Sequence, residues 1–105
     1  MKKTIEFKLS LILTKEDMNR LRIKEKDEET EITADVHGMS VKRAKRFINN
    51  ILNIVRTKVQ LIIIHGYNHG TAIKDMLADQ FVNEHIVEKY LDSENQGVTN
   101  IVAAA

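Results

Sequence analysis

The chain has 105 residues, enough for one domain with a single modest hydrophobic core. Its content of 43% hydrophobic and 30% charged residues, with a net charge of +1, is typical of a soluble globular protein. The absence of cysteine excludes disulfides and thiolate metal sites, and no apolar run reaches the length of a transmembrane helix or a signal-peptide core. We therefore expect a cytoplasmic protein that has no membrane partner.

The N-terminal segment, residues 1–29, predicts a strand followed by a charged connection. Apolar residues occupy every second position from Ile5 to Leu13, which is the period of a strand. Residues 15–31 are mostly charged and predict a short helix or an irregular connection. The apolar face of the predicted strand suits addition to the sheet edge of a partner protein or of a second copy, giving a homodimer.

The next segment predicts a strand and then a basic helix. The strand covers residues 31–36 and ends at His37-Gly38, and Ser40 is a suitable N-cap for a helix over residues 41–56. Residues 37–58 contain six Lys or Arg and no acidic residue. The helical period places four of these cations opposite the apolar stripe, where they either form a solvated surface or bind the phosphates of a nucleic acid: Lys42, Lys45, Arg46 and Arg56.

The remaining sequence predicts a second strand, a second helix and two final strands. Residues 59–64 are almost entirely apolar, as in a buried strand, and a helix begins near Thr71. Strands over residues 86–91 and 98–103 flank the turn "DSENQG". The order β-α-β-α-β-β over residues 30–105 predicts an α/β fold with a mixed four-stranded sheet and two helices.

Two strand ends share a His-Gly pair, "DVHG" before the first helix and "IIHG" before the second. If these strands are parallel neighbours, both pairs lie at the carboxyl edge of the sheet, where α/β proteins place ligands beside helix N-termini. Either histidine alone is more simply a surface residue with an incidental hydrogen bond. Two matching corners favour an anion site, with a loop built from His65, Gly66, Asn68, His69 and Gly70.

Asp35 and His37 are two residues apart, so both side chains point to the same side of an extended strand. A carboxylate beside an imidazole suits proton transfer, or the holding of a divalent cation near a phosphate. Asp35 alternatively serves only to hydrogen-bond a backbone turn. The spacing of His65 and His69 across a glycine loop has no fixed geometry, and we predict no protein metal site there.

Three segments resemble the Smr (small MutS-related) domain: "ADVHGMSVKRAKRFINNIL", "LIIIHGYNHGTAIKDML" and "NQGVTNIVA". The resemblance covers residues 31–103. Its Asp-x-His motif falls on Asp35 and His37, its second His-Gly on His65 and Gly66, and its last loop glycine on Gly70. Ala34, Tyr67 and Asn68 depart from the family pattern, and Tyr67 offers an aromatic surface on which a base can stack.

The resemblance implies a two-layer sandwich like the C-terminal domain of translation initiation factor three, and an endonuclease acting on DNA or RNA. In that hypothesis Asp35, His37 and His65 are catalytic, with or without Mg²⁺ or Mn²⁺ as cofactor. Gly66, Tyr67, Asn68, His69, Gly70 and the four cations of the basic helix bind the nucleic acid. The alternatives are a nucleic-acid or ribonucleoprotein binding module without catalysis, and a protein-interaction domain.

Overall fold

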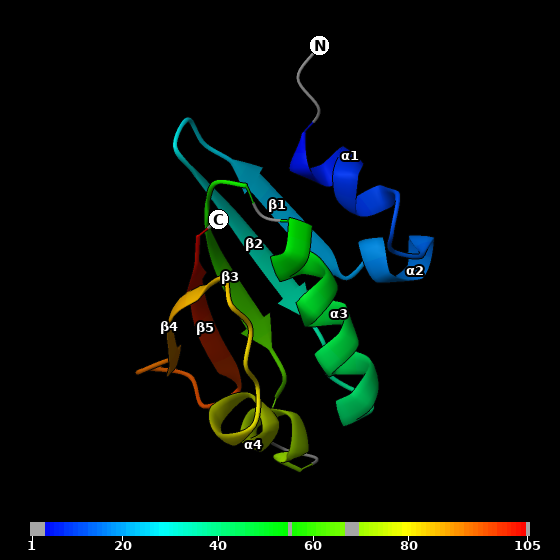
Figure 1. Ribbon diagram of the computed structural model, residues 1–105. Helices are drawn as coiled ribbons and strands as arrows, with labels where there is room; N and C mark the ends of the chain where they lie inside the picture. Colours follow the sequence, from blue (N-terminus) through cyan, green and yellow to red (C-terminus); the bar gives the residue numbers. More distant parts are fainter. Residues whose placement is uncertain (1–3, 55, 67–69, 105) are drawn as a thin grey trace.

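The computed structural model describes residues 4–54, 56–66 and 70–104 as an α/β domain (Figure 1). The described residues form four helices and a five-stranded mixed sheet. In chain order the elements are α1 (Ile5–Ser10), α2 (Lys15–Met18), β1 (Leu21–Glu25), β2 (Glu29–Asp35), α3 (Val41–Ile54), β3 (Lys58–Ile64), α4 (Ala72–Asp79), β4 (Ile86–Leu91) and β5 (Val98–Ala103).

The strands lie in the order β1-β2-β3-β5-β4. β2 and β3 are parallel, whereas β1–β2, β3–β5 and β4–β5 are antiparallel pairs. The predicted succession of strand, helix, strand, helix and two strands over residues 31–103 is confirmed. The predicted parallel pairing of the first two of these strands and the antiparallel pairing of the last two are also confirmed.

The helices cover one face of the sheet. Alternate residues of β2 and β3, among them Ile32, Ala34, Leu61 and Ile63, are fully buried on that face against the helices. The intervening residues of both strands are partly or fully exposed, so the described elements leave the opposite face of the sheet open. We call this second surface the open face.

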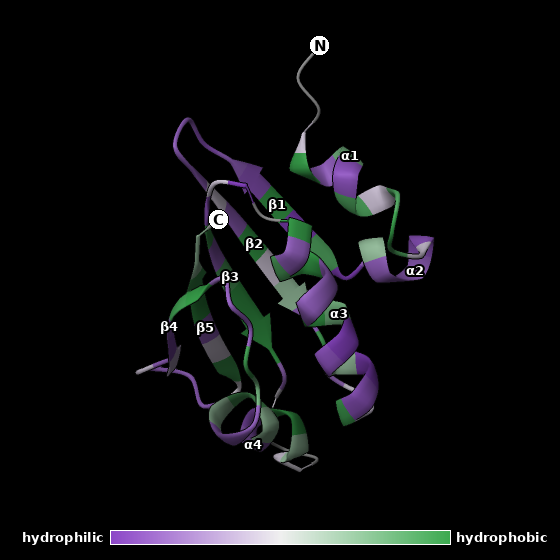
Figure 2. Cartoon of the chain, viewed as in Figure 1, coloured by the Kyte–Doolittle hydropathy of each residue, from purple (hydrophilic) through white to green (hydrophobic). Residues whose placement is uncertain are grey.

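α3 is the longest of the described helices, and its amphipathic sequence explains its position. The Ser40 hydroxyl accepts a hydrogen bond from the Arg43 amide at 3.1 Å, which confirms the predicted N-cap. Apolar residues at helical spacing are buried, and hydrophilic and hydrophobic positions alternate around the helix (Figure 2). The buried set is Ala44, Phe47, Ile48, Ile51 and Leu52.

The prediction of an N-terminal strand was wrong, because this segment forms α1. Ile5, Leu9 and Leu13 are spaced by four residues and are buried, so they satisfy a helical period as well as the alternation of a strand. Thr4 decides between the two, since its hydroxyl accepts the Phe7 amide hydrogen at 3.1 Å and caps the helix. Leu11, which shares a strand face with Leu9, is 67% exposed.

The sheet also has one strand more than predicted. The charged stretch contains the short helix α2, as expected, but it continues into β1, which pairs with β2 along the edge of the sheet. Leu21 and Ile23 of β1 pack against the core, and so does Met18. A homodimer or partner complex through an N-terminal strand at residues 4–13 therefore loses its structural basis. None of the helices described here is long and apolar enough to cross a membrane.

Two single substitutions of leucine by alanine distinguish a helix from a strand in the N-terminal segment. Leu9→Ala should lower the free energy of unfolding by about 2–5 kcal/mol, because the Leu9 side chain is fully buried. Leu11→Ala, the matched control, should change it by less than about 0.5 kcal/mol. Urea denaturation of both variants measures the difference, and equal losses would contradict the helix.

Candidate functional site

The register of β2 and β3 brings the two His-Gly corners to one edge of the sheet. Asp35 is the partner of Ile64 in the parallel ladder, and the Val36 amide donates to the Ile64 carbonyl at 2.9 Å. Both strands therefore end together, as the sequence predicted. Between the corners and the start of α4 lies a groove of about 820 Å³, whose lining includes His37, Gly38, His65, Gly66, Gly70 and Lys74. We call it the edge groove.

The first corner is a tight turn that requires glycine. The Met39 amide donates to the Val36 carbonyl at 3.1 Å, which closes a four-residue turn with His37 and Gly38 at its centre. Gly38 has a φ of +81°, close to the value of about +80° at the third position of a type II turn. The turn leaves the His37 side chain 68% exposed at the mouth of the edge groove.

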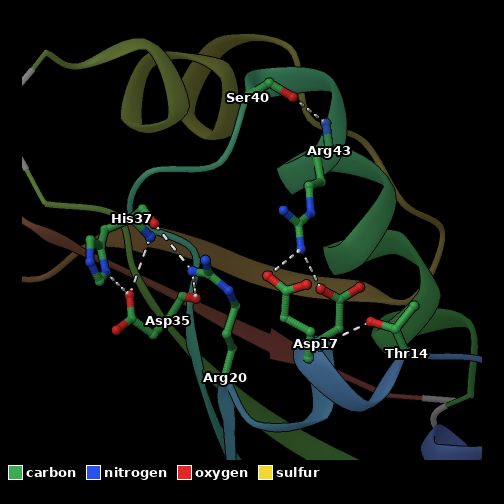
Figure 3. A network of polar contacts seen from close by, with 8 residues as sticks. Thr14, Asp17, Arg20, Asp35, His37, Ser40 and Arg43 are labelled. Atoms are coloured by element: carbon green, nitrogen blue, oxygen red, sulfur yellow. Dashed lines mark hydrogen bonds and ion pairs between the residues drawn. The ribbon is translucent and has the colours of Figure 1, made fainter.

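Asp35 and His37 lie side by side and are hydrogen-bonded to each other, as their spacing in the sequence predicted. The His37 Nδ1 is hydrogen-bonded to the Asp35 Oδ1, and the His37 amide donates to the same oxygen at 3.2 Å (Figure 3). The Asp35 side chain is 40% exposed, so the pair is open to solvent. With Nδ1 directed at a carboxylate, the neutral imidazole carries its proton on Nδ1 and presents Nε2 as a proton acceptor.

Arg20 stabilises this corner and was missed by the sequence analysis. Its Nη1 donates to the carbonyl oxygens of Asp35 and His37, each at 3.2 Å, and the Asp35 amide donates to the Arg20 carbonyl at 2.9 Å. Figure 3 shows the guanidinium reaching from the chain before β1 to both residues. Arg20 lies within a mostly charged stretch, where no pattern distinguishes it from its neighbours.

His65, the third candidate catalytic residue, lies in a different environment from His37. It is only 7% exposed. Its Nδ1 lies 2.8 Å from the Gly66 carbonyl oxygen and its Nε2 lies 2.8 Å from the Thr99 hydroxyl. Because the carbonyl can only accept, Nδ1 donates, and the neutral ring accepts at Nε2 from Thr99. Both ring nitrogens are thus used within the fold, and His65 joins the end of β3 to β5.

The turn between β4 and β5 supports the second corner. The Gly97 carbonyl accepts hydrogen bonds from the amides of His65 at 2.9 Å and Gly66 at 3.1 Å. Asp92 organises this turn by accepting from Asn100 Nδ2 at 2.9 Å and from the Asn95 amide at 3.1 Å. These bonds, the one from Asn100 foremost, hold the pKa of Asp92 below its ordinary value. This turn is predicted by the sequence, but its contribution to the groove is not.

The cations of the predicted basic helix lie in different environments. Lys42, Lys45 and Arg46 are exposed in the first two turns of α3, a helix that begins two residues after Met39 in the wall of the edge groove. Arg43 instead binds Asp17 of α2 at 2.8 Å, and this hydrogen bond raises the pKa of its guanidinium above the ordinary value. Arg56 lies beyond the far end of α3, whose last residue Ile54 is about 18 Å from Lys42 at 1.5 Å per residue, so the structure does not bring it to the groove.

Gly66 and Gly70 both line the edge groove, and Gly66 adopts a φ of +73°. Tyr67, Asn68 and His69 lie outside the described residues. Within the part of the chain that the structure describes, no group of three or more His, Asp or Glu side chains is arranged to hold a metal ion. Comparisons with models of protein families, with curated proteins and with solved structures gave no match.

The buried hydrogen bond between His65 and Thr99 should contribute to stability. Thr99→Val removes the hydroxyl and leaves Nε2 of a buried imidazole without its partner, which should cost about 1–3 kcal/mol of unfolding free energy. Thr33→Val, on the open face, makes the same chemical change at a half-exposed position and serves as control. Equal unfolding free energies of the two variants in urea would refute this role.

The lowered pKa of Asp92 predicts a defined pH dependence of stability. Since the folded-state pKa lies below the unfolded-state value of about 3.9, the ionised carboxylate stabilises the fold above that value. The contribution disappears as the pH falls through the folded-state pKa. Asp92→Asn should therefore be less stable than the wild type at pH 7, and the difference should shrink below about pH 4. Thermal unfolding across this range tests the sign, and a difference that grows in acid would contradict it.

Proposed function

We propose that this protein binds nucleic acid and cleaves its phosphodiester backbone at the carboxyl edge of the sheet. The observation that carries the proposal is the Asp35–His37 pair, which is exposed beside a groove where two strand ends and the start of α4 meet. Carboxyl edges of this kind are the usual ligand sites of α/β sheets. A hydrogen-bonded carboxylate and imidazole in such a groove form a unit suited to general base catalysis.

The chemistry follows from the orientation of His37. Asp35 accepts a hydrogen bond from the Nδ1–H group, so Nε2 is available to take a proton from an attacking water, or from a ribose 2′-hydroxyl in RNA. The attacking oxygen then forms a bond to phosphorus, and the bond from phosphorus to the leaving oxygen breaks as that oxygen takes up a proton from solvent water. Asp35 stabilises the imidazolium that forms, and Arg20 fixes the backbone that carries both residues.

In this proposal, groups at the start of α4 stabilise the phosphate charge. The Thr71 hydroxyl donates to Asp75 at 2.9 Å and caps none of the helix amides. The first turn of α4 therefore presents amide hydrogens without a side-chain cap to the groove that it lines, and Lys74 adds a positive charge there. His65 enters the proposal as a positioning residue, because both its ring nitrogens are bonded within the fold.

We assign the domain to an Smr-like type on three motifs that lie at the same edge. "DVHG" ends β2, "IIHG" ends β3, and Gly97 and Thr99 of "NQGVTN" bond to the second corner. The proposal includes a topology like the C-terminal domain of translation initiation factor three, for which the order of strands and helices over residues 29–103 is the support.

A divalent cation is compatible with the residues present. Mg²⁺ and Mn²⁺ often bind through one or two protein carboxylates and the phosphates of the substrate, and Asp35 supplies one carboxylate at the groove. Such an ion, when bound, would neutralise phosphate charge.

Substitution of the pair should abolish cleavage and preserve binding. Asp35→Asn and His37→Ala should each reduce the rate on plasmid DNA or structured RNA by at least about 100-fold, the contribution expected of a general base. Asp79→Asn alters an exposed acid at the end of α4 and should cleave like the wild type. The assays are run with and without Mg²⁺ or Mn²⁺.

Two outcomes would reject parts of the proposal. Cleavage that survives both substitutions would show that the activity belongs to another protein in the preparation or to another site. Salt-dependent binding by the wild type without cleavage under any metal condition would select the binding module, in which the same groove holds nucleic acid without hydrolysing it.

A further inference from the structure

A second basic surface lies on the open face of the sheet, where the sequence analysis predicted none. Leu21 and Ile23 of β1 pack against the core, so Arg22 and Lys24 project to the opposite side. Together with Arg20 they line a hollow of about 460 Å³, whose wall also includes Asp35. Alternate residues of a strand are about 7 Å apart. We call Arg20, Arg22 and Lys24 the β1 row.

The charges of the β1 row are only partly compensated. Among the described residues, neither Arg22 nor Lys24 has an acidic partner within 4.0 Å, although Glu31, the cross-strand neighbour of Lys24, and Asp35 also line the hollow. Glu31 lies 3.8 Å from Lys26, and Asp35 bonds to His37. Two exposed cations therefore stand in line with Arg20 and lead along the edge strand towards the Asp35–His37 pair. Positive charge arranged in this way complements a sugar-phosphate backbone.

The β1 row and the basic residues of α3 lie on different layers of the domain. Lys42, Lys45 and Arg46 are on the helical layer, the β1 row is on the open face, and the carboxyl edge with Asp35 and His37 lies between them. A nucleic acid that contacts both surfaces must bend around this edge. The shortest dimension of the domain is 23 Å, whereas duplex DNA resists bending over a persistence length of about 50 nm. An unpaired strand bends freely on this scale.

We propose that Arg22 and Lys24 bind the backbone of an unpaired nucleic-acid strand and that this strand passes over the carboxyl edge between the β1 row and α3. The inference rests on the proposed function, since it places the scissile phosphate at the Asp35–His37 pair. It adds a binding surface and a substrate class, an unpaired segment of DNA or RNA. A duplex reaches only one of the two basic surfaces.

The experiment measures binding by fluorescence anisotropy across a salt series. The probes are one short labelled sequence as unpaired DNA, as unpaired RNA and as a duplex. Arg22→Gln/Lys24→Gln removes two charges of the β1 row, and Lys42→Ala/Lys45→Ala/Arg46→Ala removes those of α3. Lys15→Gln/Lys58→Gln is the matched control, because it removes two exposed lysines that lie outside both surfaces. Thermal unfolding establishes that every variant is folded.

Arg22→Gln/Lys24→Gln should weaken binding of the unpaired strands roughly tenfold at low salt and flatten the slope of log affinity against log salt by about 1.4, which is 0.7 for each lost contact. Its affinity for the duplex should equal that of the wild type. The α3 variant should weaken binding of all three probes, and the control should weaken none.

The results separate this inference from the proposed function. If the α3 variant loses affinity while Arg22→Gln/Lys24→Gln binds unpaired strands like the wild type, the β1 row is not a binding surface and the proposed function stands. An equal loss in the lysine control, or an equal loss on the duplex, would also overturn the inference. If the wild type binds no probe, the proposed function fails and the inference fails with it.

Discussion

The parallel pairing of β2 and β3 is the constraint on which the site depends. It aligns Asp35 with Ile64, so that both strands end at the same level, with a His-Gly pair directly after β3 and one residue after β2. A slip of one residue in this ladder would turn Asp35 towards the core and Ala34 towards the open face. The apolar residues Ile32, Ala34, Leu61 and Ile63 oppose such a slip, because all four are fully buried in the correct register. The hydrophobic core thus fixes the position of the polar pair.

The two corners have different tasks, although their sequences are alike. His65 is buried and uses both ring nitrogens to join β3 to β5, while the turn at Asp92 and Gly97 holds the adjacent backbone. His37 projects into solvent from a turn that Arg20 ties to the start of β1. A preorganised site needs reactive groups that are held in position by neighbouring residues, and these neighbours must themselves be fixed by hydrogen bonds. The exposed pair and the hydrogen-bonded groups beside it fit this description. In our proposal the second corner is the rigid support and the first performs the chemistry.

Sequence patterns were sufficient for the region in which period and punctuation agree. The strands and helices from residue 29 onwards, the Ser40 cap and the meeting of the two corners were all predictable from apolar spacing and from the His-Gly pairs. The prediction for the N-terminal segment failed because Ile5, Leu9 and Leu13 satisfy two periods at once, and the Thr4 cap together with the burial of these three side chains selects the helix. The burial of His65 and the bonds of Arg20 depend on residues more than ten positions away, Thr99 and Asp35 among them, which no local pattern can supply.

The most direct test of the central claim is to locate bound nucleic acid by ¹H–¹⁵N correlation NMR. A short unpaired phosphorothioate oligonucleotide, which resists cleavage, is titrated into the full chain. We predict that the largest shift changes fall on His37, Gly38 and Gly66 at the carboxyl edge, with smaller changes along β1. Changes concentrated at the opposite edge of the sheet, around Glu29 and Lys58, would contradict the claim that the two His-Gly corners form the binding site.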